Sequence, residues 1–433
     1  MKEITLMKNR PKSNVLIAGA LAIAGLIPSR PAAAEPLDHV GKVFYIYMEN
    51  HNWVQPNGNV DNSPTSGIEQ IKGNPAAPFI NRLIDPTDPL SSDVSYTNNC
   101  YNVLATPSGA NPSIHPSEPN YIWQEGGSNF GVTGDADPYK DTTDASGNVF
   151  SLPNISGLLQ NIGFSWESYQ EDVDLEPTAG SVNQPGPNSL TSTVASRDEW
   201  TVPLTGFSGT SSAYVNPYNG SHQYNFAPKH DGTLFFTTTN GGTTTAGDYS
   251  TTNPEVPHYR PLQALERDLD RDSVGRFNAI TPDQYNDMHT ALSGGFTYNG
   301  VLYTGDAANI AQGDHFLREV VPMIMASKAY QHDGMIVIWS DETESEGAAD
   351  ITQNDFSHSV MEIIISPRAK GHAYHNDAIT YTHSSDVETL QELFPIGPKQ
   401  GQPFLGQAST DAAGDHSYSD MFEDHDRDDH KRK

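Results

Sequence analysis

The chain has 433 residues, which is enough for two average domains or for one large α/β domain with long insertions. Its formal net charge of −30 excludes tight binding to DNA or RNA as a main activity, because nucleic-acid phosphates would be repelled. The negative charge is still compatible with small phosphorylated substrates, since a local cation can attract them. The single cysteine, Cys100, excludes an intramolecular disulfide. We therefore expect one domain stabilised by its core and by bound metal, of undetermined oligomeric state.

The first 34 residues have the pattern of a secretory signal peptide. Basic residues precede an apolar stretch at 15–27, and three alanines at 32–34 offer a cleavage site. An uncleaved anchor is the alternative, but this stretch is short for a bilayer. Removal of residues 1–34 takes away five basic residues and one acidic residue, so the net charge moves from −30 to −34. We expect a secreted protein, periplasmic or extracellular, with no stable membrane anchor.

Polar residues follow two predicted buried strands at the point where each strand ends. The apolar run 43–48 stops abruptly at Glu49 and Asn50, and the run 334–339 is followed by Ser340, Asp341 and Glu342. In open α/β sheets, ligands bind beyond the carboxyl ends of the strands, and clustered carboxylates would repel one another there without a cation. The two strand ends together predict a metal site. The alternative is that each acidic residue only caps a strand exit.

Between these strands, apolar spacing predicts a helix around 79–84 and a short helix through Leu158 and Leu159 that ends at Gly163. A strand is expected at 164–169. Residues 175–255 are dominated by Ser, Thr, Gly, Asn and Pro, which predicts a loop-rich surface insertion.

The C-terminal half resumes regular structure. Apolar residues at helical spacing between Phe316 and Ile324 predict a helix, in which Pro322 marks a bend or a late start. A third strand is expected at 361–365, and a capping box at Ser385 opens a last helix.

The predicted fold class is α/β, with a mixed, mostly parallel central sheet flanked by helices. A catalytic domain is expected at 35–410. The tail, 411–433, is polar and charged and is expected to be disordered.

The most specific motif is His-Pro-Ser-Glu-Pro-Asn-Tyr at 115–121. Together with Glu-Asn-His at 49–51 and Asp-Glu at 341–342, it resembles the phosphoesterase family that unites secreted acid phosphatases with bacterial phospholipases C. That family belongs to the alkaline-phosphatase-like superfamily. Further matching segments extend to 381–386, so the resemblance spans almost the whole mature chain in order and implies an alkaline-phosphatase-like fold.

The resemblance implies a divalent metal ion of undetermined identity. It also implies a hydroxyl nucleophile, and Ser117 is favoured over Ser113 because it alone stands in the Pro-Asn context of the superfamily's phosphodiesterases. A bound cation lowers the pKa of a coordinated oxygen by several units, so Ser117 can attack phosphorus and form a phosphoserine that water then hydrolyses. The implied metal ligands are Glu49, Asn50, Ser117, Asp341 and Glu342.

Charge on the transferred phosphoryl group requires donors around its non-bridging oxygens. The expected catalytic histidines are His115, two residues before Ser117, His230, and His383, at the start of the last predicted helix. Protonated imidazoles would account for an acidic optimum, whereas a second metal would require neutral ones. A lone histidine is more often a surface or core residue. The phosphate-binding candidates are Asn120, Lys229, His289 and His358.

The phospholipase C branch typically continues through a glycine-rich run after Asp-Glu and adds C-terminal β-domains. Here Asp341-Glu342 is followed by Thr-Glu-Ser-Glu-Gly, and the sequence ends soon after the last predicted helix. We therefore expect an acid phosphatase acting on small phosphate monoesters. The alternatives are a phospholipase C-type phosphodiesterase and, as a non-enzyme, a secreted binding protein with an inactive site.

Overall fold

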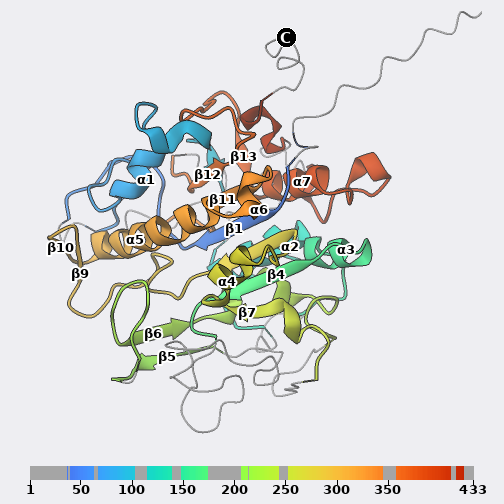
Figure 1. The fold of residues 1–433 in the computed structure, drawn as a ribbon, viewed down its shortest axis with the longest axis horizontal. Coiled ribbons are helices and arrows are strands. Elements are labelled where there is room, and N and C mark those ends of the chain that lie inside the picture. Colours follow the sequence, from blue (N-terminus) through green and yellow to red (C-terminus); the bar gives the residue numbers. More distant parts are fainter. Residues whose placement is uncertain are drawn as a thin grey trace, which may run out of the picture. The chain divides into compact units, whose positions relative to one another are not determined.

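The computed structural model describes residues 37, 40–62, 67–102, 115–138, 148–173, 206–212, 214–242, 252–344, 357–410 and 416–423. Within these residues, seven strands form one sheet in the order β2-β12-β11-β1-β8-β4-β7 (Figure 1). Strand β12 is antiparallel to both of its neighbours, and the other pairs along β11, β1, β8, β4 and β7 are parallel. The predicted mixed, mostly parallel sheet is confirmed. The strands are β1 (Val43–Met48), β2 (Val94–Thr97), β4 (Trp166–Gln170), β7 (Tyr259–Pro261), β8 (Phe277–Thr281), β11 (Met335–Ser340) and β12 (Glu362–Ile365).

Strand β1 lies at the centre of the sheet, and all of its residues are buried. Its register with β11 pairs Val43 with Met335 and Met48 with Ser340. On its other side β1 pairs with β8 in the same direction. A strand buried on both faces reads as a continuous apolar run, which is why β1 and β11 could be recognised in the sequence. The carboxyl ends of these parallel strands meet at one edge of the sheet.

Helices cover both faces of the sheet. One apolar core joins Phe44, Ile46 and Met48 of β1 to helices α1, α4 and α5. The alternate residues of β1, Tyr45 and Tyr47, face a second core shared with α2, α3 and α7. The helices are α1 (Pro78–Leu83), α2 (Ser117–Gly126), α3 (Ile155–Asn161), α4 (Ala264–Asp270), α5 (Asp306–Met325), α6 (Lys328–Gln331) and α7 (His383–Leu393).

Smaller elements complete the fold. Strand β3 (Cys100–Tyr101) pairs with β13 (Tyr381–Thr382), β5 (Phe207–Thr210) with β6 (Gln223–Phe226), and β9 (Phe296–Tyr298) with β10 (Val301–Tyr303). Short 3-10 turns are η2 (Pro89–Asp93), η5 (Pro228–His230), η6 (Gly232–Phe235), η7 (Val256–His258), η8 (Pro398–Gln400), η9 (Ala408–Thr410) and η10 (Tyr418–Met421).

Two predicted helix starts were wrong. Helix α5 begins at Asp306, well before Phe316, and continues through Pro322 to Met325. Pro322 removes one backbone hydrogen bond of the helix, but its neighbours Val321 and Ile324 are buried in the core, so packing holds the last turn in place. Helix α7 begins at His383 instead of Ser385, because Thr382 is the N-cap and Ser385 is its capping-box partner.

The prediction of a disordered tail was wrong for residues 416–423. Tyr418, Met421 and Phe422 are buried in the same core as α7. The hydroxyl of Tyr418 donates a 3.4 Å hydrogen bond to Asp386 of that helix. These apolar side chains pack residues 416–423 against the core. The prediction of disorder was based on the overall charge of the tail and did not take them into account. Residues 411–415 and 424–433 lie outside the described part.

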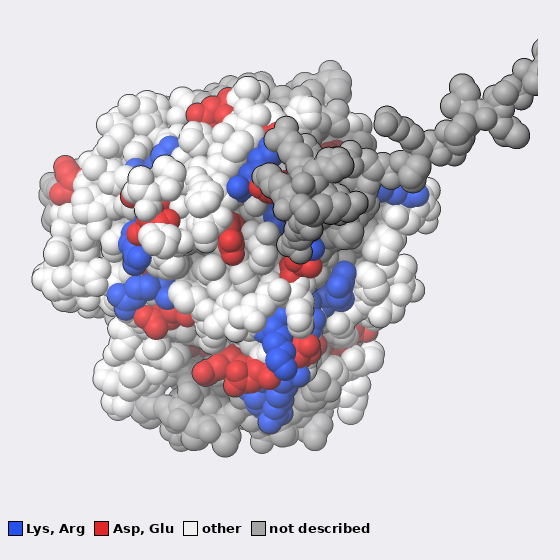
Figure 2. Space-filling model, turned by 45° about the horizontal axis from the view of Figure 1, so that its top comes forward, with Lys and Arg blue, Asp and Glu red and all other residues white. Residues whose placement is uncertain are grey.

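The predicted signal peptide, 1–34, also lies outside the described residues, as does much of the predicted insertion. No helix in the described ranges has the length and apolar character needed to span a bilayer. On the face drawn in Figure 2, Lys and Arg side chains lie among Asp and Glu side chains, and they do not form a separate basic surface.

Candidate active site

The predicted acidic residues meet at the carboxyl edge of the sheet. Glu49 follows β1, while Asp341 and Glu342 follow β11. The amide of Asp341 donates to the carbonyl of Met48 at 3.3 Å, so the parallel pairing extends past both strand ends. The amide of Glu49 donates to the carbonyl of Asp287 at 2.7 Å, which brings in the loop after β8. The side chains of all four acidic residues, Glu49, Asp287, Asp341 and Glu342, are buried.

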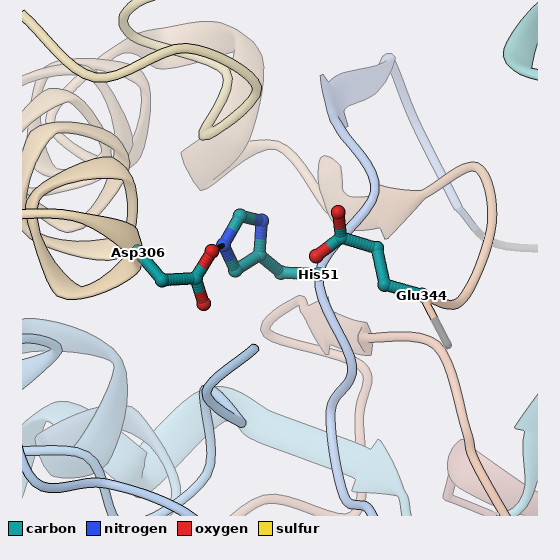
Figure 3. Close-up of side chains that lie close together, drawn as sticks. All are labelled: His51, Asp306 and Glu344. Carbon is teal, nitrogen blue, oxygen red and sulfur yellow. Dashed lines mark ion pairs between the residues drawn. The ribbon is translucent and has the colours of Figure 1, made fainter. Parts of the chain in front are cut away.

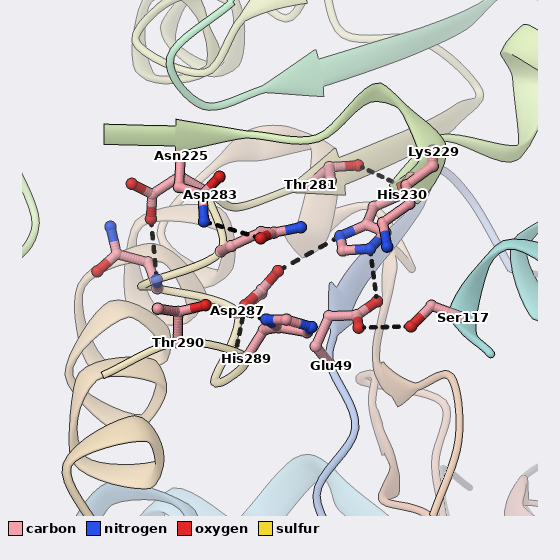
Figure 4. Close-up of polar contacts among 12 residues, drawn as sticks. Glu49, Ser117, Asn225, Lys229, His230, Thr281, Asp283, Asp287, His289 and Thr290 are labelled. Carbon is pink, nitrogen blue, oxygen red and sulfur yellow. Dashed lines mark hydrogen bonds and ion pairs between the residues drawn. The ribbon is translucent and has the colours of Figure 1, made fainter. Parts of the chain in front are cut away.

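Ser117 is the first residue of α2, and its hydroxyl points at the carboxylate of Glu49 (Figure 4). It donates to Oε2 of Glu49 at 2.9 Å and lies 3.4 Å from Oε1 of Glu342. Tyr121 lies one helical turn later on the same face and donates to Oε1 of Glu49 at 2.7 Å. Helix α2 therefore fixes both oxygens of Glu49 and presents Ser117 to the acidic residues of the sheet edge.

The predicted ligands fit a divalent cation. Burial, together with the charge of Glu342, raises the pKa of Glu49 to about 8 against the hydrogen bond from Tyr121. Burial and the charge of Glu49 raise the pKa of Asp341 well above its ordinary value. Neither carboxylate oxygen of Asp341 has a hydrogen-bond partner among the described residues. Asn50 is half-buried directly after Glu49. A cation would compensate these crowded oxygens.

Two histidines near Glu49, His230 and His289, are held neutral by burial. Nε2 of His230 lies 3.3 Å from Oε1 of Glu49, its Nδ1 lies 3.6 Å from Oδ2 of Asp287, and its ring stacks on Tyr121 at 5.0 Å. Burial lowers the pKa of His230 well below its ordinary value. The ring of His289 lies 6.2 Å from that of His230, and burial, together with the Lys229 charge, lowers its pKa to about 4. Protonated imidazoles at these two positions are therefore not supported, and neutral ones suit metal coordination.

His115 and Lys229 also lie close to the carboxylates of the site. Nδ1 of His115 lies 2.7 Å from Oε2 of Glu342, and a third of its side chain is exposed. Nζ of Lys229 lies 2.5 Å from Oδ2 of Asp135, and the Lys229 charge lowers the pKa of Glu49. Burial lowers the pKa of Lys229, but Asp135 outweighs this effect, so the net shift is upward. Lys229 is therefore a cation close to the carboxylates.

His383 does not face the site, which corrects its predicted role as a phosphate donor. Nε1 of Trp339 donates to its Nδ1 at 3.1 Å, and its Nε2 contacts the carbonyl oxygen of Asp341. The ring is fully buried, and burial lowers its pKa to about 4. Both ring nitrogens are thus engaged within the protein. His383 instead positions the backbone that carries Asp341.

The remaining candidates have local partners. Nδ1 of His358 lies 2.9 Å from the Ser357 hydroxyl. Nδ2 of Asn120 donates to the carbonyl of Pro116 at 3.3 Å, within the first turn of α2. These contacts do not test phosphate binding, so the role of both residues stays a prediction. Ser113, the rival nucleophile, lies outside the described residues.

Two residues of the site were not assigned in the sequence, namely Tyr121 and Asp287. Asp287 follows β8, which was missed because polar Asn278 interrupts its apolar run. The Nδ2 amide of Asn278 donates to the carbonyls of Val43 and Gly275, both at 3.0 Å. Had β8 been recognised in the sequence, the residues that follow it would have pointed to Asp287 as a further acidic residue beside Glu49.

Closely packed ligand groups also occur elsewhere. Among the described residues, two sets of three His, Asp or Glu side chains have ligand atoms that all lie within 4.8 Å of one another. Neither set contains Glu49, Asp341 or Glu342. The side chains of these predicted ligands would therefore need to move closer together to bind one ion. The sets are His51 with Asp306 and Glu344, and Glu171 with Asp172 and Asp283.

Comparison with solved structures gives distant neighbours. A protein in the alkaline phosphatase superfamily from Vibrio parahaemolyticus has a TM-score of 0.44 and 10% identity, over 87% of this chain and 73% of that one. A sulfatase from Pseudoalteromonas sp., PsFucS1, has a TM-score of 0.45 and 10% identity, over 87% and 73%. The lipoteichoic acid synthase LtaP from Listeria monocytogenes has a TM-score of 0.43 and 8% identity, over 88% and 78%.

Sequence comparison gives a curated relative and a family. The phosphatidylinositol-3-phosphatase of Mycobacterium tuberculosis is 28% identical over 168 residues, which cover 39% of this chain and 42% of that protein. The chain thus spans less than half the length of this curated relative. The model of the Phosphoesterase family matches residues 111–397, which include Ser117, Asp341 and Glu342. With that match over most of its length and an acidic site around a helix-borne serine, the chain belongs to the phosphoesterase family.

Proposed function

We propose that the chain is a secreted, metal-dependent acid phosphatase that hydrolyses phosphate monoesters through Ser117. The observation that carries the proposal is the 2.9 Å hydrogen bond from the Ser117 hydroxyl to buried Glu49, with Glu342 at 3.4 Å. Family membership supports phosphoric ester hydrolysis. The name of the Mycobacterium tuberculosis relative, a phosphatase, supports a monoester substrate. The signal-peptide pattern of residues 1–34 supports secretion.

A divalent cation bound there would lower the pKa of the Ser117 hydroxyl and offset the charge of the phosphoryl group. The residues that would hold it are Glu49, Asn50, Ser117, Asp341 and Glu342. Glu49 receives the hydroxyl proton of Ser117 along the existing hydrogen bond, and the serine oxygen attacks phosphorus. The new O–P bond replaces the P–O bond to the leaving alkoxide, which takes up a proton. Water then hydrolyses the phosphoserine and restores the serine.

The flanking residues have complementary roles in this proposal. Lys229 places a positive charge near Glu49, where it can bind non-bridging phosphoryl oxygens. His115 is held by Glu342 on the more exposed side, which suits proton donation to the departing alkoxide. His230 and His289 stay neutral and, with Asp287, favour metal coordination over cationic phosphate binding. The net charge of −30 favours a small phosphorylated substrate over nucleic acid.

The test compares p-nitrophenyl phosphate with p-nitrophenyl phosphorylcholine from about pH 4 to about pH 9. We expect preferential monoester turnover at acidic pH, lost in Ser117→Ala and after chelation. Ser113→Ala is the matched control and should retain turnover. Full activity in Ser117→Ala would contradict the nucleophile, and preference for the choline diester would favour a phospholipase C. No turnover of either ester would favour the inactive binding protein.

A further inference from the structure

Three side chains from three separate segments meet beside the strand ends that carry the candidate active site. His51 follows β1, Glu344 follows β11, and Asp306 is the first residue of α5. Their ligand atoms all lie within 4.8 Å of one another. Figure 3 shows the imidazole of His51 directed at Asp306, with the carboxylate of Glu344 on the other side. We propose that these residues form a second divalent-metal site, distinct from the one around Ser117.

His51 is the buried member of this group, with 1% of its surface exposed. Its Nε2 lies 3.1 Å from Oδ1 of Asp306. Its Nδ1 has no hydrogen-bond partner among the described residues, and neither does Oε2 of Glu344. Buried polar atoms in folded proteins are nearly always satisfied, and an ion is one of the few explanations when they are not. The group therefore offers nitrogen and oxygen lone pairs that the protein itself does not use.

Hydrogen bonds from outside the group position the carboxylate of Asp306 and the backbone of Glu344. The amide of Glu69 donates to Oδ2 of Asp306 at 2.6 Å, which leaves Oδ1 directed at His51. The side chain of Asn52 brackets the backbone of Glu344, since its Oδ1 accepts from the Glu344 amide and its Nδ2 donates to the Glu344 carbonyl, both at 2.9 Å. Contacts of this kind orient metal ligands and strengthen ion binding.

The charge of the group favours a cation. It has two carboxylates and one imidazole, so even a protonated His51 leaves a net charge of −1. Burying that charge without compensation is costly. Asp306 and Glu344 are half-buried, so an ion can reach them from solvent while His51 holds it on the inner side.

The ligand chemistry indicates the class of ion. One imidazole with two carboxylates suits zinc, iron(II) or manganese(II) better than calcium or magnesium, which prefer all-oxygen sites. Two ligands each about 2.1 Å from one ion lie at most about 4.2 Å apart, so small side-chain movements close the group. His51 and Glu344 lie two residues beyond Glu49 and Glu342. An ion here would therefore clamp the same two strand ends and tie them to α5.

The test measures bound metal directly and does not depend on activity. Zinc is loaded by equilibrium dialysis of the metal-free protein and quantified by mass spectrometry. The background is Glu49→Gln/Asp341→Asn, which removes two ligands of the candidate active site. We expect this background to keep about one equivalent of zinc. Adding His51→Gln or Glu344→Gln should abolish it, and excess calcium should leave it bound.

Glu255→Gln is the matched control. It removes a carboxylate that lies 3.5 Å from His258 but belongs to neither ligand group, so zinc binding should persist. Glu344→Gln removes one charge at a half-buried position and keeps the shape of the side chain, so this variant should fold. It therefore keeps the test valid if His51→Gln fails to fold. Absence of zinc from the double-variant background, or retention after both His51→Gln and Glu344→Gln, would overturn the site. Displacement by calcium would overturn the class of ion.

Discussion

Tyr121 donates a 2.7 Å hydrogen bond to Oε1 of Glu49 and thereby leaves the other oxygen of that carboxylate to Ser117. The two donors stand one turn apart at the start of α2. A single helix thus sets both the orientation of the Glu49 side chain and the position of Ser117, the proposed nucleophile.

Tyr121→Phe should lower kcat/KM for p-nitrophenyl phosphate roughly tenfold, because a hydrogen bond to a buried carboxylate is lost. That bond lowers the pKa of Glu49, so its loss should also move the Glu49-dependent limb of the pH profile upward. The measurement is kcat/KM against pH. Tyr47→Phe is the control, since Tyr47 packs against Tyr121 but donates to Gln124. Equal losses in both variants would contradict a specific role for Tyr121.

His383→Gln should weaken metal binding at the active site roughly tenfold or more, because the ring supports the backbone that carries Asp341. Chelator competition measures the affinity. His258→Gln is a matched control, because His258 stacks on Trp166 and its Nδ1 lies 2.7 Å from that residue's carbonyl, away from the site. Unchanged affinity in His383→Gln would refute the positioning role.

Removing the metal should make stability depend on pH. Burial raises the pKa of Glu49 from 4.5 to about 8, and Asp341 is shifted in the same direction. The folded, metal-free protein therefore holds protons that the unfolded chain has released. This stabilisation is fully present below the unfolded pKa and is lost as pH rises through the folded one. We expect chelated protein to melt at a lower temperature at pH 8 than at pH 5, and added metal to restore the melting temperature at pH 8. Equal melting temperatures of the chelated protein at the two pH values would exclude this linkage.

Asp314 provides a stability test away from the site. Its carboxylate accepts from the amides of Phe79 and Ile80 at 3.0 and 2.8 Å and so holds the start of α1. Asp314→Ala should lower the free energy of unfolding by about 1–3 kcal/mol while kcat is kept. Denaturant unfolding measures the change. An unaltered midpoint, or loss of kcat in a folded variant, would count against this role.

The pH dependence at Asp314 has a defined sign. Burial raises its pKa from 3.8 to about 7, outweighing the two amide hydrogen bonds. Its contribution is therefore greatest below the unfolded pKa and falls as pH rises through about 7. The stability difference between wild type and Asp314→Asn should shift against the wild type over this range, which urea unfolding at several pH values would detect. A constant difference would contradict the pKa shift.

The sequence predicted the parts of the site that depend on strand ends and on a local motif. Strands β1 and β11 were recognisable because they are buried on both faces, and Ser117 because of its Pro-Asn context. The direction of a side chain was not predictable: the imidazole of His383 turns to Trp339 and the Asp341 carbonyl instead of the site. Asp287 was missed because its strand, β8, is short and contains Asn278. These outcomes depend on long-range packing, which local spacing does not record.

The docked segment 416–423 gives the protein a built-in chemical reporter. The hydroxyl of Tyr418 lies 3.7 Å from the sulfur of Cys100, which is fully buried and is the sole thiol of the sequence. Because Tyr418 is one of the side chains that pack against Cys100, release of this segment should raise the reactivity of Cys100 toward alkylating reagents, with no engineered label. We therefore expect thiol labelling to speed up when the C-terminal segment detaches, and a chain shortened at residue 410 to react faster than the full chain.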